Sequence, residues 1–292
     1  MKKLSVFILL VLIIFSGSSL FAQQKVALLI GISDYHAVDQ KTGWDDIHGV
    51  NDVKLLSPVL KSQGFSVDHL TDADATYDNI VKQLKSLAKK VNRGSVVYIH
   101  FSTHGQPFED INHDETDGWD ESIVPVDARM EYKKGVYEGA KHLLDDELNT
   151  YTEAIRVKVG PAGRLYVVVD ACHAGKASRG FYDEVIRGTK QGFSPNGLYY
   201  KPKRESETHY DISYSANKAP VVYLEACKST QYNSEIKKDG TYYGALSYYI
   251  YQVVSKHAIG VDASWVYKVQ ELMRQDNSLQ DQDMVIEISK IK

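Results

Sequence analysis

The chain reads SVVYIHFSTHG at residues 95–105 and RLYVVVDACHAG at residues 164–175. Each stretch opens with an apolar run of mostly β-branched and aromatic residues, which is too short for a helix and predicts a strand buried on both faces. Each run ends in small and reactive residues. In a parallel sheet these ends lie at the same edge, where ligands bind. We therefore expect His104 and Cys172 to lie close together on neighbouring strands.

The rest of the chain continues this alternation of strands and helices. Residues 25–32 (KVALLIGI) and 221–226 (VVYLEA) predict two further buried strands, and residues 284–288 predict a last one. Thr76 is the expected N-cap of one helix, and Pro58 predicts a kink or a later start in another. Apolar residues recur at helical spacing in the segments 51–63, 77–91, 145–154, 244–254 and 264–274. The pattern predicts an α/β fold with a mostly parallel central sheet covered by helices on both faces.

Composition and charge set the broad class of the protein. The 292 residues are 43% hydrophobic and 25% charged, which is typical of a globular chain with a sizeable core. The formal net charge is −4, with acidic and basic residues interspersed, so nothing favours a nucleic-acid surface. We expect no nucleic-acid partner.

The first 22 residues resemble a signal peptide. Lys2 and Lys3 precede an apolar run over residues 4–15, and small residues follow up to Ala22, after which we expect cleavage. The alternative is an uncleaved anchor, although the run is shorter than the roughly 20 residues that span a membrane. The sequence thus predicts an exported protein, periplasmic or secreted, with no stable membrane insertion after cleavage.

A long connection divides the mature chain into two parts. Residues 176–218 are rich in Gly, Ser, Pro and basic residues and show little periodicity, so they predict a surface connection. Residues 23–175 then form a larger catalytic part, and residues 219–292 a smaller part of the same domain. The connection offers basic residues for self-cleavage, and while uncut it can serve as a zymogen lid over the cleft; the alternative is a solvated basic loop. The basic residues are Arg179, Arg187, Lys190, Lys201, Lys203 and Arg204.

Cys172 and His104 together suggest nucleophilic catalysis. A thiol becomes a strong nucleophile when a nearby imidazole removes its proton, and the imidazolium can then protonate a leaving amine. The backbone N–H groups of Gly105 and Cys172 can bind the oxyanion. The only other cysteine is Cys227, so a Cys172–Cys227 disulfide is the alternative in an oxidising compartment.

These motifs resemble those of caspases and, more closely, metacaspases (peptidase family C14). FSTHG matches the family's His motif, and DACHAG matches D-x-C-H-S-G with Ala174 in place of Ser. Caspases carry Gln where this chain has Asp170. The similarity extends from KVALLIGI at residue 25 to YYGALSYYI at residues 242–250 and so spans nearly the whole mature chain. It implies a caspase-like three-layer αβα sandwich and a cysteine-type endopeptidase that is a monomer, with Cys172 as nucleophile and His104 as base.

The residues near Cys172 predict a basic P1 specificity. Asp170 places a carboxylate beside the nucleophile, which attracts a cationic side chain and repels the Asp that caspases prefer. The resemblance adds Asp52 and Ser102 to this S1 pocket, although Asp52 is alternatively a helix N-cap. We expect peptide or protein substrates with Arg or Lys at P1.

An acidic stretch over residues 110–121 raises the question of calcium. It mimics an EF-hand loop, but Glu115 stands where a Gly makes the turn. The resemblance implies instead that Asp120, Asp145 and Asp146 bind calcium, with Arg179 at a fourth position where it cannot ligate. Calcium is thus a candidate activator and no cofactor is required. The alternative is a solvated acidic loop in which Asp145 and Asp146 cap a helix.

Other readings of these residues are weaker. His100 and His104 are four residues apart on a strand, about 13 Å and too far for one zinc ion. A clostripain- or gingipain-like peptidase shares a His-Gly and a Cys on strand ends, but DGWDESIVPVD at residues 117–127 favours the metacaspase side. A non-catalytic module with a caspase-like fold would be expected to lack Cys172 or His104, and both are present.

Overall fold

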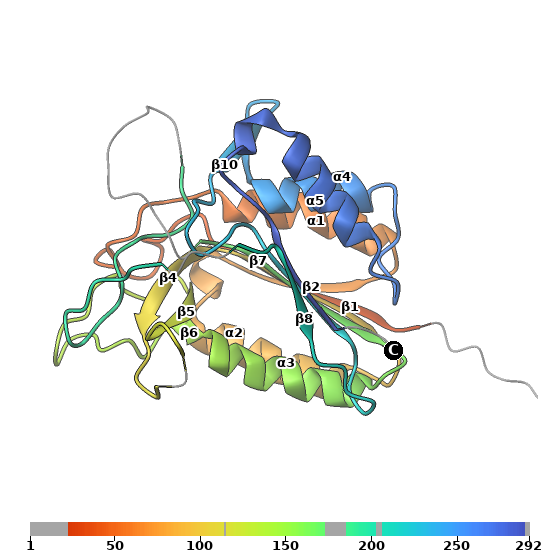
Figure 1. The fold of residues 1–292 in the computed structure, drawn as a ribbon, viewed down its shortest axis with the longest axis horizontal. Helices are drawn as coiled ribbons and strands as arrows, with labels where there is room; N and C mark the ends of the chain where they lie inside the picture. The colour runs from red at the N-terminus through yellow and green to blue at the C-terminus, as the bar shows by residue number, and fades with distance from the viewer. Residues whose placement is uncertain (1–22, 114, 173–184, 203–205, 290–292) are drawn as a thin grey trace, which may run out of the picture.

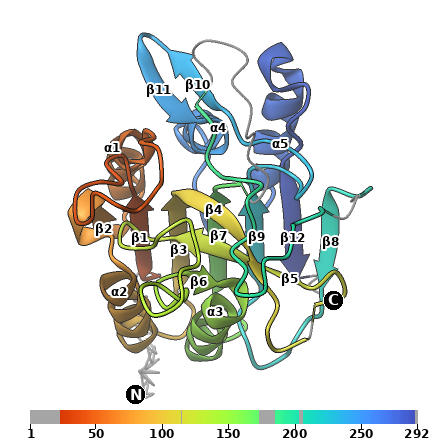
Figure 2. The same ribbon diagram turned by 90° about the vertical axis from the view of Figure 1, so that its left-hand side faces the viewer.

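The computed structural model describes residues 23–113, 115–172, 185–202 and 206–289. Seven strands form the central sheet, in the order β2-β1-β3-β7-β9-β12-β8 (Figure 2). Their bounds are Lys25–Gly31 (β1), Ser66–Thr71 (β2), Val96–Ser102 (β3), Arg164–Asp170 (β7), His209–Ile212 (β8), Val221–Glu225 (β9) and Val285–Ser289 (β12). The first five strands in this order are parallel, whereas β12 runs antiparallel to β9, and β8 is parallel to β12. The predicted mostly parallel sheet is confirmed.

Helices cover both faces of the sheet (Figure 1). One face carries α1 (Gly49–Ser62), α4 (Ala245–Val254) and α5 (Trp265–Gln275), and the other carries α2 (Tyr77–Lys90) and α3 (Asp145–Val159). The 3-10 turns are η1 (Asp72–Asp74) and η2 (Asn277–Leu279). This is the three-layer αβα arrangement that the sequence predicts.

Two small sheets lie at the end of the molecule where the active-site segments emerge. The three-stranded sheet consists of β4 (His104–Glu109), β5 (Trp119–Val124) and β6 (Leu143–Leu144). The hairpin consists of β10 (Glu235–Lys238) and β11 (Thr241–Gly244).

Side chains that alternate in direction along the strands form two hydrophobic cores, one on each face of the sheet. Val97, Ile99 and Phe101 of β3 point toward α2 and α3, whereas Val96 and Tyr98 belong to the core under α1, α4 and α5. Because successive side chains of a strand point to opposite faces, His100 and Ser102 continue the second set. The end of β3 therefore presents polar groups to α1 and α4. β7 does the same with Asp170, which follows the inward Tyr166 and Val168.

Two predictions differ from the structure, one on the start of α1 and one on the exposure of the connection. α1 begins at Gly49 and runs through Pro58, so the later start is wrong; its buried Val53, Leu56 and Leu60 outweigh the one hydrogen bond that Pro58 cannot donate. The connection is not wholly a surface segment either. Arg187 and Phe193 are 0% and 1% exposed, and β8 pairs with β12.

The predicted signal peptide over residues 1–22 lies outside the described residues. None of the helices in the described part of the chain combines the length and apolarity that crossing a bilayer requires.

Buried histidines make the fold sensitive to acid. Burial lowers the pKa of His100 and His104 to about 4 and that of His142 to about 3. The unfolded chain binds protons at these positions below about pH 6.5, so stability is lost as pH falls from 6.5 toward 4. Burial also raises the pKa of Asp52 to about 7, so protonation of this carboxyl stabilises the fold as the pH falls. This gain from one group is smaller than the loss from the three histidines.

We expect urea titrations of the Cys172→Ala chain to show a free energy of unfolding at least about 2 kcal/mol lower at pH 5 than at pH 7.5. The range from pH 7.5 to 8.5, where no unperturbed imidazole titrates, serves as the control. A free energy that is equal at pH 5 and 7.5 would contradict the prediction.

Candidate active site

His104 and Cys172 lie at the same edge of the sheet. β3 and β7 are parallel neighbours, and their last paired residues are Ser102 and Asp170. His104 and Cys172 each follow that pair by two residues, and both are buried, at 3% and 1% exposure. The register thus brings the predicted base and nucleophile to one place.

The imidazole of His104 has a defined tautomer. Its Nε2 lies 2.9 Å from the backbone carbonyl oxygen of Asp45, which can only accept, so Nε2 carries the proton. Nδ1 therefore holds the lone pair, and it has no hydrogen-bond partner in the described part of the chain. Burial lowers the pKa of His104 to about 4, although the Asp45 carbonyl opposes this. At neutral pH the ring is an unprotonated base with Nδ1 available.

Aromatic residues hold this ring in place. The centroid of the His104 ring lies 4.7 Å from that of Tyr35 and 4.8 Å from that of Trp44. The Tyr35 hydroxyl accepts a hydrogen bond from the His104 backbone N–H at 2.7 Å and donates one to the Val124 carbonyl at 3.0 Å. Sequence reasoning missed these residues, since nothing local to them marks contact with a residue far along the chain.

The predicted pocket residues converge on the α1 and α4 side of the sheet. The Ser102 hydroxyl donates to Oδ2 of Asp52 at 2.7 Å, and Oδ1 of Asp52 accepts from the Gly244 N–H at 3.0 Å. Asp52 lies in the first turn of α1, whose N-cap is His48 without a side-chain bond, so the alternative reading of Asp52 as N-cap is wrong. Asp170 accepts from the N–H and hydroxyl of Ser247, at 2.8 and 2.6 Å. The start of α4 thus holds both carboxylates, as expected for anions at a helix N-terminus.

Arg187 of the connection fills this pocket. Its Nη1 lies 2.7 Å from Oδ2 of Asp52 and 3.6 Å from Oδ1 of Asp170. Its Nε and Nη2 donate to Oε1 of Glu235, at 3.1 and 2.9 Å. The interpretation of this part of the connection as a solvated basic loop is wrong for Arg187, because three buried carboxylates compensate its charge.

The cluster is strongly coupled. Burial opposes the charge on Arg187, but Asp52, Asp170 and Glu235 raise its pKa above the ordinary value. Burial likewise opposes the charge on Asp170, yet Arg187 and the bonds from Ser247 and Asn233 hold the pKa of that carboxyl below its usual value. Asp170 and Arg187 therefore form an ion pair at neutral pH.

The backbone beside Arg187 is bound as an extra strand. The Cys172 N–H donates to the Arg187 carbonyl at 2.7 Å, and the Arg187 N–H donates to the Asn233 carbonyl at 3.0 Å. The Glu235 N–H donates to the Val185 carbonyl at 2.8 Å. Residues 185–187 thus pair antiparallel with residues 233–235, in the manner of a peptide bound by strand addition.

The next residue passes between the two motifs. Gly188 forms parallel β-bridges with both Gly105 and Cys172. A Cβ at this position would lie 1.8 Å from the Cys172 carbonyl oxygen, so only glycine fits. The Arg187–Gly188 peptide bond therefore lies between the residues predicted as oxyanion donors, with the Arg187 carbonyl on the Cys172 N–H.

A family model of the caspase domain matches residues 24–284. The chain belongs to the caspase family. Metacaspase-1 of Candida albicans is 28% identical over 280 residues, covering 80% of this chain and 58% of that protein. Metacaspase-1 of Coccidioides immitis is 34% identical over 166 residues, covering 53% and 32%. Over the long alignments, the chain spans about three fifths of the length of its curated relatives.

A solved structure supports the fold of this caspase-family chain. The crystal structure of a protein from Geobacter sulfurreducens matches with a TM-score of 0.60 and 21% identity, over 92% of this chain and 94% of that one. At this identity the likeness concerns the fold alone.

The two cysteines of the caspase-family chain are neighbours. Both are buried thiols in contact, and both point at the Gln231 carbonyl oxygen, with Sγ distances of 3.0 Å for Cys172 and 3.7 Å for Cys227. A hydrogen bond with Cys172, and then burial, raises the pKa of Cys227 well above its ordinary value. Cys227 is thus kept protonated beside the predicted nucleophile, and the structure contains no Cys172–Cys227 disulfide.

The predicted calcium ligands do not form a compact group. Asp120 is buried in β5, whereas Asp145 and Asp146 begin α3 and line a cavity of about 340 Å³ beside Cys172. Within the described ranges, their carboxylates are not among the groups of three ligand atoms within 4.8 Å of one another. Arg179 lies outside the described residues. Calcium binding by these residues stays a prediction.

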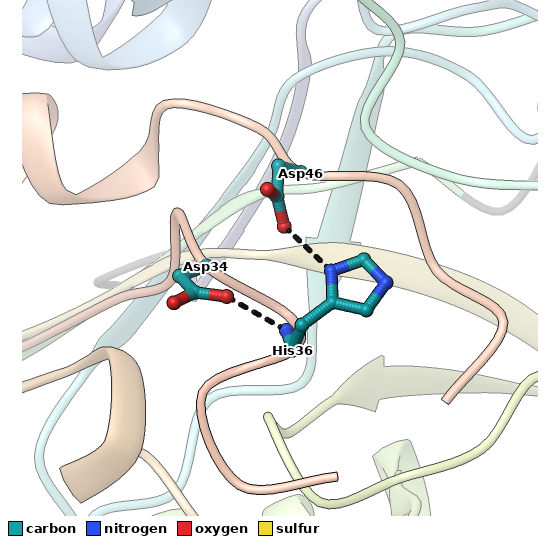
Figure 3. Close-up of side chains that lie close together, drawn as sticks. All are labelled: Asp34, His36 and Asp46. Carbon is teal, nitrogen blue, oxygen red and sulfur yellow. Dashed lines mark hydrogen bonds and ion pairs between the residues drawn. The ribbon is translucent and has the colours of Figure 1, made fainter. Parts of the chain in front are cut away.

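The one such group in the described residues is Asp34, His36 and Asp46 (Figure 3). His36 Nδ1 lies 3.2 Å from Oδ1 of Asp46, and Oδ1 of Asp34 accepts from the His36 N–H at 2.8 Å. Asp46 also accepts from the Tyr35 N–H at 3.0 Å. These bonds brace the loop that carries Tyr35 and Asp45, both of which contact His104.

A substitution at Gly244 tests how much free space the pocket has beside Asp170 and Arg187. Its φ of −62° and ψ of 137° suit any residue, but a Cβ would lie 2.2 Å from Oδ2 of Asp170 and 2.4 Å from Nη1 of Arg187. In the Cys172→Ala background, we expect Gly244→Ala to lower the free energy of unfolding by about 1–3 kcal/mol, as overpacking does. Urea titration measures the loss.

The matched control is Gly260→Ala, because a Cβ at Gly260 meets no heavy atom within 4 Å. We expect it to change stability by no more than about 0.5 kcal/mol. Equal stabilities of the two variants would show that the pocket has room beside Arg187.

Proposed function

We propose that this protein is a cysteine endopeptidase that cleaves peptide bonds after basic residues. The observation that carries the proposal is the position of Arg187, whose side chain fills the acidic pocket while its carbonyl oxygen lies 2.7 Å from the Cys172 N–H. A basic P1 residue of a substrate would occupy the same place.

The proposed mechanism uses the tautomer of His104. Nδ1 takes the proton from the Cys172 thiol, and the thiolate attacks the carbonyl carbon of the P1 residue. The negative charge on the former carbonyl oxygen is stabilised by the N–H of Cys172, with Gly105 as the second donor. The imidazolium then protonates the leaving amine, and water hydrolyses the thioester to release the acid and the thiol.

The charge of the pocket supports the basic specificity. Asp52, Asp170 and Glu235 are all buried, so an acidic P1 side chain would add a fourth buried carboxylate. A cationic side chain instead compensates groups that are costly to bury without a partner.

The same geometry supports self-processing at the Arg187–Gly188 bond. Val185 to Arg187 correspond to P3 to P1 of a substrate, and Gly188 corresponds to P1′. While the bond is intact, Arg187 excludes other substrates from the pocket, so the uncut chain is a zymogen. Cleavage leaves Arg187 at a new carboxyl-terminal end, which can then dissociate from the pocket.

Three further properties are part of the proposal. We propose export through residues 1–22 to the periplasm or the medium, function as a monomer, and activation by calcium through Asp120, Asp145 and Asp146. The assays below therefore include calcium and a chelator as separate conditions.

Mass spectrometry of the purified chain tests self-processing. We expect wild type to yield one fragment that ends at Arg187 and one that begins at Gly188, whereas Cys172→Ala stays intact. Arg187→Ala should lose this cleavage, because the pocket then holds no cation. Lys190→Ala is the matched control, since Lys190 is a nearby basic residue outside the pocket, and it should be cut normally.

As a control for folding, a cooperative thermal unfolding transition of Arg187→Ala would show that this variant is folded. An intact wild type under every condition, or cleavage of Arg187→Ala between residues 187 and 188, would refute self-processing at this bond.

Fluorogenic peptides that differ only at P1 test the specificity. We expect kcat/KM for Arg to exceed that for Asp by at least about 30-fold, because the loss of a charge-assisted bond and the burial of an unpaired carboxylate each cost about 1–3 kcal/mol. Cys172→Ala should be inactive. A preference for Asp would show that the pocket is assigned wrongly.

A further inference from the structure

Glu235 forms a second wall of the pocket that the sequence motifs do not mark. It begins β10, and its side chain is fully buried. Its Oε1 accepts from Nε and Nη2 of Arg187, whereas Asp52 and Asp170 contact only Nη1. The pocket therefore grips the guanidinium from two sides.

The Glu235 carboxylate is held independently of Arg187. The His48 N–H donates to Oε1 at 2.8 Å, and His48 Nδ1 lies 2.5 Å from Oε2. His48 in turn stacks on Tyr242, with ring centroids 4.9 Å apart. Because the acceptor is already oriented before a P1 side chain enters, little is lost in ordering it.

A guanidinium and an ammonium meet such a pocket differently. Arginine offers five N–H donors in a rigid planar fork, and three of its nitrogens engage opposite walls here. Lysine has one nitrogen, which can lie against Asp52 and Asp170 or against Glu235, but not at both positions that Nη1 and Nε occupy. A lysine would leave one buried carboxylate without its cationic partner.

We propose, on the basis of the proposed peptidase function, that the pocket selects arginine over lysine at P1 and that Glu235 is the residue that makes this distinction. The Glu235 N–H also binds the Val185 carbonyl, which corresponds to P3. Glu235 would thus contact the P1 side chain through its carboxylate and the substrate backbone through its N–H.

The test compares peptides with Arg or Lys at P1, in an Arg187→Ala background that vacates the pocket. We expect the parent to show a kcat/KM for Arg at least about tenfold above that for Lys, since the loss of one bond to a charged group weakens binding by about tenfold or more. Adding Glu235→Gln should reduce the ratio to about threefold or less, mainly through slower cleavage of the Arg peptide. Because both peptides meet the same preparation, partial unfolding does not alter the ratio.

Glu153→Gln is the matched control. Glu153 is a partly buried carboxylate that pairs with Arg156 on α3, outside the pocket, and its removal should leave the ratio unchanged. Equal use of Arg and Lys by the parent, or an equal loss for both peptides in Glu235→Gln, would overturn the inference while leaving the peptidase assignment intact. Failure of both self-processed wild type and this parent to cleave any peptide would refute the peptidase function itself.

A second measurement does not need catalysis. In the Cys172→Ala chain, Arg187→Lys places an ammonium in the same pocket. We expect it to lower the Tm by at least about 4 °C when Glu235 is present and by clearly less beside Glu235→Gln, since the two positions are coupled. Identical Tm shifts in both backgrounds would show that Glu235 does not distinguish the two cations.

Discussion

The buried cluster of Arg187 with Asp52, Asp170 and Glu235 joins four separate segments of the chain. Its members come from α1, β7, β10 and the connection. Carboxylates buried this deeply destabilise a fold unless a cation accompanies them, and removing one partner of such a pair typically costs about 3–5 kcal/mol. The acidic residues therefore create a requirement for a cation, which the connection meets in the uncut chain.

The same requirement links stability to specificity. Under the proposed function, a pocket that needs a cation for its own electrostatic balance would bind a basic side chain and reject an acidic one. In the proposed zymogen, a substrate would have to compete with an arginine that is held at high effective concentration by its own chain. The proposed cleavage would change that competition, since Arg187 would then belong to a chain end that can dissociate.

Sequence reasoning predicted that His104 and Cys172 lie at one edge of the sheet, but it did not find all of the residues that surround them. β3 and β7 are largely apolar runs that end two residues before His104 and Cys172, so a parallel register was enough to bring these residues together. Glu235 could not be found in this way. It stands in a polar stretch without periodicity, and its place depends on the β10–β11 hairpin and on His48, which is 187 residues away.

Arg187 illustrates a different limit. It was one of several basic residues in a segment without regular structure, and composition favours the surface for such a segment. What singles it out is the glycine that follows, because only Gly188 fits against the Cys172 carbonyl, and the backbone pairing with residues 233–235. Both are properties of the folded cleft. Local patterns can thus nominate residues for chemistry, whereas the choice among equivalent arginines is made by tertiary contacts.

Chemistry and specificity have separate supports in this fold. The base is fixed by Tyr35, Trp44 and the Asp45 carbonyl on one side of the cleft, and none of these contacts the carboxylates of the pocket in the described residues. The pocket is fixed by α1, α4 and β10 on the other side. The two sets meet at the end of β3, because Ser102 bonds to Asp52 and His104 follows two residues later. They also meet at Cys172, whose N–H is the proposed oxyanion donor and so sets the distance between the reacting carbonyl and the bound side chain. In the proposed mechanism, this donor places a P1 residue that fits the pocket for attack by the thiolate.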